Sequence, residues 1–167
     1  MTVSSVFLGF DSQVPARYDE RAKSHFEVIS EDGKKFGVVY FGPDIYPGQG
    51  DTLNPNPTLP MHAAVAHEVV HFHRHRDGTQ FNEFGLEHLD EALTSLEAAI
   101  KFPRELSGHD VSELVRDAAY RIMQFRHTIL LAQAAGSSVE GFLNPAPGAA
   151  EATEDSQTTG AAAETTE

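Results

Sequence analysis

The sequence predicts a single α+β domain, in which a small antiparallel sheet precedes three helices. β-branched and aromatic segments recur up to residue 41, a composition typical of strands. Between residues 61 and 135, apolar side chains recur at the three- and four-residue spacings of amphipathic helices. The chain has 167 residues, the length of one domain. We therefore expect one folded domain over residues 1–136 and a tail over residues 137–167.

The predicted sheet is built from three strands near the N-terminus. Residues 3–10 are β-branched and aromatic, and residues 25–29 alternate roughly between polar and apolar side chains, as a half-buried strand does. Asp32 followed by Gly33 is a hairpin turn signal. Residues 35–41 are therefore the expected return strand, and the sheet contains one clear hairpin.

A long irregular loop is expected over residues 42–60, where five prolines and three glycines fall within nineteen residues. Long loops in compact domains are often functional. This loop leads into a helix predicted over residues 61–76, with Pro60 suited to its first turn and Thr58 as a candidate cap. Gly78 ends this helix.

The predicted helix over residues 61–76 has two distinct faces. Its apolar stripe is formed by Met61, Val65, Val69 and Phe72. At 100° per residue, His67 and His71 lie nearly on the opposite side. We therefore expect the two histidines to face a second partner surface rather than the layer that packs on the apolar stripe.

The next helix is expected over residues 82–102, and Pro103 stops it. Its predicted core stripe repeats at spacings of three and four residues and consists of Leu86, Leu89, Leu93, Leu96 and Ile100. The opposite side carries His88 and Glu91 among the small residues Ala92, Ser95, Ala98 and Ala99. Small side chains let another helix approach closely, so we expect this side to be buried as well.

A third helix is expected over residues 111–135, with Asp110 and Glu113 as a capping-box-like start and Gly136 as its stop. Its predicted core stripe is Val111, Val115, Ala118, Ile122, Phe125 and Ile129. Residues 137–167 contain six acids, no base and almost no large apolar side chain. We interpret them as a disordered acidic tail.

The composition excludes several classes of function. The net charge of −13, from 25 acids and 12 bases, argues against binding to nucleic acid or to an anionic membrane. Because the chain has no cysteine, any metal must be held by His, Asp or Glu. The sequence has no visible signal peptide and no apolar run long enough for a membrane span. We expect a cytoplasmic protein.

One short stretch carries the strongest functional signal. His67, Glu68 and His71 form the pattern His-Glu-x-x-His in the middle of a predicted helix. Residues four apart lie on one face of a helix, so both imidazoles can reach one Zn²⁺, with Glu68 beside the metal as a general base. A zinc site needs a third protein ligand, and the following helix offers Glu87, Asp90 and Glu91.

Nineteen residues separate His71 from Glu91, which lies in the sequence Asp-Glu-Ala-Leu-Thr-Ser. In this spacing and local sequence, residues 61–100 resemble the gluzincin metallopeptidases, in which a glutamate on the next helix completes the zinc site. The resemblance implies one Zn²⁺ per chain, held by His67, His71 and Glu91. It also implies a compact core similar to that of the minigluzincins.

The sequence departs from this family pattern in several places. The family has an acid four residues after the third ligand, whereas this chain has Ser95, a weaker orienting partner for a ligand histidine. No oxyanion-stabilising Tyr or His stands at a recognisable spacing, and the candidates for that role or for contact with the ligands are His75, His88, Tyr120 and His127. As third ligand, Asp90 fits the spacing of related aminopeptidases and Glu87 lies one turn before Glu91, so both stay open.

The resemblance implies that the chain hydrolyses peptide bonds of a peptide or protein substrate. A zinc-polarised water would attack the carbonyl, and Glu68 would take its proton and pass it to the leaving amine. An edge strand would hold the substrate extended by backbone pairing. We predict residues 35–41 as this edge strand and the loop at residues 42–60 as a rim or lid.

Two other functions remain open from the sequence. Glu68 and His71 also form the Glu-x-x-His pattern of ferritin-like di-metal carboxylate proteins, although that site needs a second such pattern and four long helices. Alternatively, the chain is a zincin-shaped binding or regulatory module that has kept its metal ligands without turnover.

Overall fold

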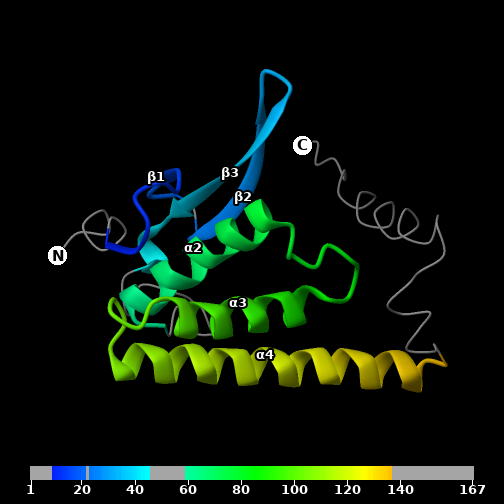
Figure 1. The fold of residues 1–167 in the computed structure, drawn as a ribbon. Coiled ribbons are helices and arrows are strands. Elements are labelled where there is room, and N and C mark those ends of the chain that lie inside the picture. Colours follow the sequence, from blue (N-terminus) through cyan, green and yellow to red (C-terminus); the bar gives the residue numbers. More distant parts are fainter. Residues whose placement is uncertain (1–8, 22, 46–58, 137–167) are drawn as a thin grey trace, which may run out of the picture.

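The chain forms an α+β domain in which a three-stranded sheet is followed by three helices (Figure 1). The computed structural model describes residues 9–21, 23–45 and 59–136. Helix α2 contacts the sheet on one side and α3 on the other, and α4 runs along α3 (Figure 1). None of the helices in these ranges is long and apolar enough to cross a membrane. The predicted acidic tail at residues 137–167 lies outside the described residues.

The predicted hairpin is confirmed. Strand β2 (His25–Glu31) pairs antiparallel with β3 (Lys34–Phe41). The turn between them places Asp32 at φ 52° and Gly33 at φ 75°, the two positive values that a type I′ turn requires. This turn matches the right-handed twist of the flanking strands, so a local sequence signal is enough to set the register.

The strand that follows Pro15 was not predicted. Strand β1 (Ala16–Tyr18) follows directly after Pro15 and pairs parallel with β3, giving the order β1-β3-β2. The prediction that residues 35–41 form an edge strand is therefore wrong, because β3 is central and β2 is the edge next to α2. The strand predicted over residues 3–10 falls mostly outside the described residues, and its last two residues are helical.

The predicted loop over residues 42–60 is described only at its ends. A short 3₁₀ helix, η1 (Pro43–Ile45), begins it, and Ile45 is buried in the core. Residues 46–58 lie outside the described part, and so do the proposed cap Thr58 and most of the proposed rim or lid.

Helix α2 (Met61–Asp77) begins and ends close to the predicted residues. Gly78 ends it at φ 66°, and its N–H donates to the carbonyls of Arg74 and His75, as in a left-handed C-cap. The helix is buried on both of its predicted faces, since Val65, Val69 and His67 are each almost fully covered. The expected second partner surface for the histidines is α3.

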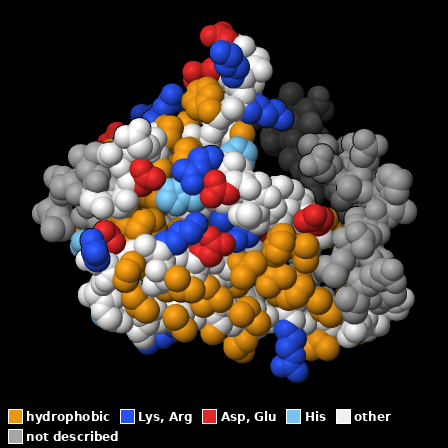
Figure 2. Space-filling model, viewed as in Figure 1, with side chains coloured by type: hydrophobic (Ala, Val, Ile, Leu, Met, Phe, Trp, Pro, Cys, Tyr) orange, Lys and Arg blue, Asp and Glu red, His pale blue; other side chains and the backbone are white. Residues whose placement is uncertain are grey.

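Helix α3 (Glu87–Lys101) begins five residues later than the predicted start at residue 82. The side of α3 that is fully buried is the small-residue side, with Ala92, Thr94, Ser95 and Ala98. The predicted Leu stripe is only half-buried, and Ile100 is 76 % exposed, so its assignment as the main core face is wrong. Small side chains allow α2 and α3 to approach closely, and hydrophobic side chains gather on the surface over α3 and α4 (Figure 2).

Helix α4 (Gly108–Ala134) begins three residues before the predicted start. Its cap is Ser107, whose side chain accepts from the N–H of Asp110 while the Asp110 side chain accepts from the N–H of Ser107, a capping box. Two members of the predicted core stripe are nearly half exposed, Val115 at 47 % and Ile122 at 46 %. The side of α4 that faces the rest of the domain, its inner stripe, instead contains charged residues, so a search for apolar periodicity does not find it. The inner stripe includes Asp110, Leu114, Asp117 and Arg121.

Candidate metal centre

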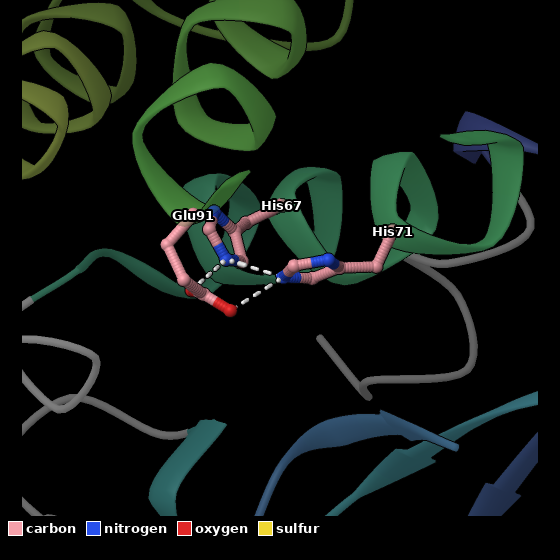
Figure 3. A group of neighbouring side chains, drawn as sticks. All are labelled: His67, His71 and Glu91. Carbon is pink, nitrogen blue, oxygen red and sulfur yellow. Dashed lines mark hydrogen bonds and ion pairs between the residues drawn. The ribbon is translucent and has the colours of Figure 1, made fainter. Parts of the chain in front are cut away.

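Three predicted ligands converge between α2 and α3 (Figure 3). The Nε2 atoms of His67 and His71 lie 3.0 Å apart. Glu91 spans both, with Oε2 at 3.2 Å from His67 Nε2 and Oε1 at 3.2 Å from His71 Nε2. Both histidines are buried, and Glu91 is partly covered.

These spacings are compatible with a bound zinc ion. Ligand atoms that each lie about 2.0–2.1 Å from one tetrahedral Zn²⁺ are about 3.3 Å apart. The two Nε2 atoms are 3.0 Å apart, each lies 3.2 Å from a different oxygen of Glu91, and one ligand atom from each residue falls within 4.8 Å of the others. Two imidazoles and a carboxylate are also an established ligand set for catalytic zinc, one that leaves a fourth position open. Within the described ranges, His67, His71 and Glu91 are the His, Asp or Glu side chains whose ligand atoms lie close enough together to hold one metal ion.

A hydroxyl on α3 fixes the proton of each histidine ring. Ser95 Oγ lies 2.9 Å from His67 Nδ1 and 2.6 Å from the Asp117 carboxylate, which can only accept. Thr94 Oγ1 donates to the Asp90 carbonyl and lies 3.5 Å from His71 Nδ1. Because both hydroxyl protons are used elsewhere, each histidine donates from Nδ1. Nε2 is then the nitrogen of each ring that would offer its lone pair to a bound metal ion.

Two residues of α4 that were not predicted from the sequence, Asp117 and Arg121, contact the residues of this candidate site. Asp117 is 5 % exposed and accepts the Ser95 hydroxyl. Arg121 Nη1 lies 2.9 Å from Glu91 Oε2, and its Nε lies 3.2 Å from Asp117. A charged pair four residues apart inside the inner stripe of a helix is the sequence signal that marks them.

Glu68, the predicted general base, is 4 % exposed, and its Oε2 has no hydrogen-bond partner among the described residues. It borders a small cavity that is also lined by Ser24, Asp44, Ile45, Leu59, Ala64 and His67. Burial is the largest influence on this carboxyl group and raises its pKa above the ordinary value. A carboxylate with a raised pKa is a stronger base than an exposed one.

The ligands themselves form a coupled charged group. Burial acts to raise the pKa of Glu91, but its hydrogen bonds to His67 and His71 and their charges outweigh this and hold the pKa far below the ordinary value. For His71, burial acts to lower the pKa, but the hydrogen bond to Glu91 and the charges of Glu91, Glu68 and Asp90 raise it overall. Without a metal ion, Glu91 is therefore an anion, and His71 retains a proton to higher pH than an exposed histidine.

The two alternative third ligands point elsewhere. Asp90 is buried, and its Oδ1 lies 2.6 Å from Arg74 Nη2 while also accepting the N–H of Phe81. Glu87 is exposed and accepts the N–H of Gly85. Neither carboxylate joins the group formed by His67, His71 and Glu91.

The remaining predicted site residues lie apart from the three ligand atoms. Tyr120 is 44 % exposed and His127 is exposed, both on the outer side of α4. His75 Nδ1 lies 3.2 Å from Gln80 Oε1, and its ring lies against Phe26. His88 is half-buried and is not part of the ligand group. Of the predicted supporting residues, Ser95 is the one in contact with a ligand.

The edge strand β2 forms the wall of the site opposite α3. Phe26 of β2 stacks on His71 with 6.4 Å between ring centroids and also contacts Phe72 and His75. The charge of His25, at the start of the same strand, acts to lower the pKa of Glu68. The site therefore lies between the sheet edge and the two helices that carry the ligands.

Comparison with known proteins adds no relative to this description. No protein-family model, no curated protein and no solved structure matches the chain.

Proposed function

We propose that the chain is a zinc-dependent metallopeptidase of the gluzincin type, a hydrolase that acts on peptide or protein substrates. The observation that carries the proposal is the convergence of His67, His71 and Glu91, whose neighbouring donor atoms are 3.0–3.2 Å apart and whose ligand atoms, one from each residue, lie within 4.8 Å of one another. Two buried histidines of α2 and a partly covered glutamate of α3 thus meet at one place between the helices, which supports a shared ligand. The absence of cysteine fits a cytoplasmic location within the same proposal.

His67, His71 and Glu91 would hold the ion, and Glu68 would act on the proton of the attacking water. When bound, zinc acts as a Lewis acid that polarises both water and a substrate carbonyl. Glu68 takes a proton at its unpartnered Oε2, because this atom has no competing donor among the described residues, and delivers it to the leaving amine. Burial supports this role, because it raises the pKa of Glu68 towards the range in which a carboxylate accepts and releases protons.

The substrate would pair with β2. This strand hydrogen-bonds to β3 on one side only within the described residues, so its other edge offers backbone groups to an extended peptide. Phe26 of β2 reaches the ring of His71, which brings that edge next to the metal ligands. A peptide added to this edge would run past the site with its carbonyls at a fixed spacing.

Metal content and peptide cleavage together test the proposal. We expect one zinc per chain in the natural protein by mass spectrometry, loss of that zinc in Glu91→Ala, and retention of zinc with loss of cleavage in Glu68→Gln. Glu87→Ala is the matched control, because it removes an exposed carboxylate one turn earlier on the same helix, and it should keep both zinc and activity.

Three other results would lead to different conclusions. Full zinc occupancy in Glu91→Ala would exclude Glu91 as the third ligand. One zinc per chain without cleavage of any peptide library would favour the inactive binding or regulatory module. Two irons per chain would favour the ferritin-like alternative, for which the described residues supply no second group of metal-binding side chains.

A further inference from the structure

Helix α4 reaches the candidate metal centre through two buried charged residues, Asp117 and Arg121. Asp117 is 5 % exposed, and its Oδ2 accepts the Ser95 hydroxyl at 2.6 Å. Ser95 Oγ in turn lies 2.9 Å from Nδ1 of His67. Arg121 Nε lies 3.2 Å from both carboxylate oxygens of Asp117, which compensates part of the cost of burying this anion.

We infer that Asp117 is a positioning residue for His67 and acts through Ser95. A serine hydroxyl has one proton, and the short contact with an ionised carboxylate uses it. Ser95 can then only accept from His67, so Nδ1 keeps its proton and Nε2 is the nitrogen that would bind the metal ion. This inference rests on the proposed metal centre and adds a residue to it that no motif in the sequence contains.

This arrangement explains how the chain can have Ser95 at the position where the gluzincins have an acid. A carboxylate in hydrogen-bond contact with a ligand histidine fixes the tautomer and strengthens the ligand. Ser95 is too short and uncharged to do this alone, but it relays the charge of an acid on the neighbouring helix. Ser95 is fully buried, so water does not compete for the relay. The acid is thus supplied from α4 rather than from the helix that carries Glu91.

Three variants test the relay through zinc affinity, measured by competition with a chromophoric chelator. We expect Asp117→Ala and Ser95→Ala each to weaken zinc binding by about 10–100-fold, the usual effect of removing such a partner. Ser95→Ala leaves the contact between Asp117 and Arg121 intact, so it reports on the relay even if Asp117→Ala folds poorly. Asp110→Ala is the matched control, because it removes a 7 % exposed carboxylate of the same helix that bonds Ser107 instead; it should lose stability but keep its zinc affinity.

A second readout follows the His67 tautomer directly. The ¹⁵N chemical shifts of the imidazole, recorded on the metal-free protein at mildly alkaline pH, distinguish a proton on Nδ1 from one on Nε2. We expect Nδ1–H in the natural protein and a shift towards Nε2–H in Asp117→Ala, because the freed Ser95 hydroxyl can then donate to Nδ1. The exchange variant Ser95→Asp with Asp117→Ser should restore both Nδ1–H and zinc affinity, since it returns a carboxylate to His67.

The inference is overturned if Asp117→Ala weakens zinc binding no more than Asp110→Ala does, or if His67 keeps Nδ1–H in Asp117→Ala. These outcomes are distinct from failure of the proposed function. A natural protein that binds no zinc would contradict the metal centre, whereas the tautomer measurement needs no metal and would still decide whether Asp117 controls the ring of His67.

Discussion

Arg74 on α2 and Asp90 on α3 form a buried ion pair, with Arg74 Nη2 at 2.6 Å from Asp90 Oδ1. Arg74 Nη1 also lies 2.6 Å from Glu97, and Nη2 donates to the Thr79 carbonyl. Arg74 follows His71 by one turn, and Asp90 directly precedes Glu91. This pair therefore fixes the two ligand-bearing helices against one another within one turn of the candidate metal centre.

Replacing Arg74 by alanine should therefore destabilise the fold strongly. Arg74→Ala leaves Asp90 buried without its cation, and removing one partner of a buried pair costs about 3–5 kcal/mol. We expect a loss of this size in the free energy of unfolding, measured by urea denaturation of the metal-free protein. Arg76→Ala is the control, because Arg76 pairs with Asp77 at the surface and should give an unchanged midpoint. Equal losses in the two variants would show that the burial of Arg74 has no energetic consequence.

Glu68 should make the metal-free protein less stable as pH rises above 4.5. Burial raises the pKa of Glu68 in the folded state above its ordinary value of 4.5, so the folded state retains this proton at a pH where the unfolded chain has released it. Its contribution is fully present below 4.5 and is lost as pH rises through the raised pKa. Glu68→Gln removes the titration, and we expect it to be roughly 1–3 kcal/mol more stable than the natural protein at neutral pH.

Denaturation of both proteins across a pH series checks this expectation. The advantage of Glu68→Gln should shrink steadily as pH falls towards 4.5, the ordinary pKa of the carboxyl group. Glu87→Gln, an exposed change on α3, should leave the profile unaltered. An advantage for Glu68→Gln that does not depend on pH would mean that its effect arises from packing rather than from the buried charge.

Zinc affinity should rise with pH because binding displaces a proton from His71. Although burial acts to lower the pKa of His71, the hydrogen bond and charge of Glu91 raise it overall. Below this raised pKa the affinity should increase by about tenfold per pH unit for one displaced proton, and above it the increase should level off. Glu91 adds no step in this range because its pKa is held far below the ordinary value. Chelator competition measured over a pH series would contradict the expectation if the affinity were constant.

Gly37 of β3 lies under two aromatic rings and should not tolerate a side chain. A Cβ at this position would lie 2.6 Å from Cε2 of Phe26 and 3.1 Å from Cδ2 of Phe72. Gly37→Ala therefore has to displace the Phe26 ring that stacks on His71, and such overpacking costs about 1–3 kcal/mol. We expect a lower free energy of unfolding and altered His71 resonances in an NMR spectrum.

Gly108→Ala is the matched control for Gly37→Ala. A Cβ on Gly108 meets no atom within 4 Å, and the residue is the first of α4. Alanine there reduces the conformational freedom of the unfolded chain, so the variant should be as stable as the natural protein or slightly more stable. If both alanine variants lost stability equally, contact with Phe26 would not be the cause.

The parts of the fold that were predicted correctly depend on local interactions. The turn at Asp32 and Gly33 needs two positive φ angles, which these residue types adopt readily. The end of α2 at Gly78 depends on one left-handed residue. The strand β1 could not be predicted in this way, because its three residues, Ala16–Tyr18, have no pattern of their own and are ordered by pairing with β3.

The core faces of α3 and α4 were predicted wrongly for a related reason. Apolar periodicity identifies the most hydrophobic stripe of a helix, but Ile100 is 76 % exposed and Ile122 is nearly half exposed, while Asp117 is buried. The expected burial of the small-residue side of α3, which carries Ser95, is confirmed. A buried charge is stable only beside its partners, and those partners come from other elements. A search for apolar periodicity along one helix therefore misses the inner stripe of α4.

The sequence by itself determined the class of the fold, the hairpin and the two histidines that share one face of α2, because turn geometry and helical spacing are local properties. It did not decide which of three neighbouring carboxylates meets them, since Glu87, Asp90 and Glu91 fall within little more than one turn of α3. Only the tertiary structure decided this: Arg74 binds Asp90, Glu87 faces solvent, and Glu91 spans both imidazoles. The physical reason is that each side chain points in a different direction around the helix, and only the packing of α2 against α3 selects one direction.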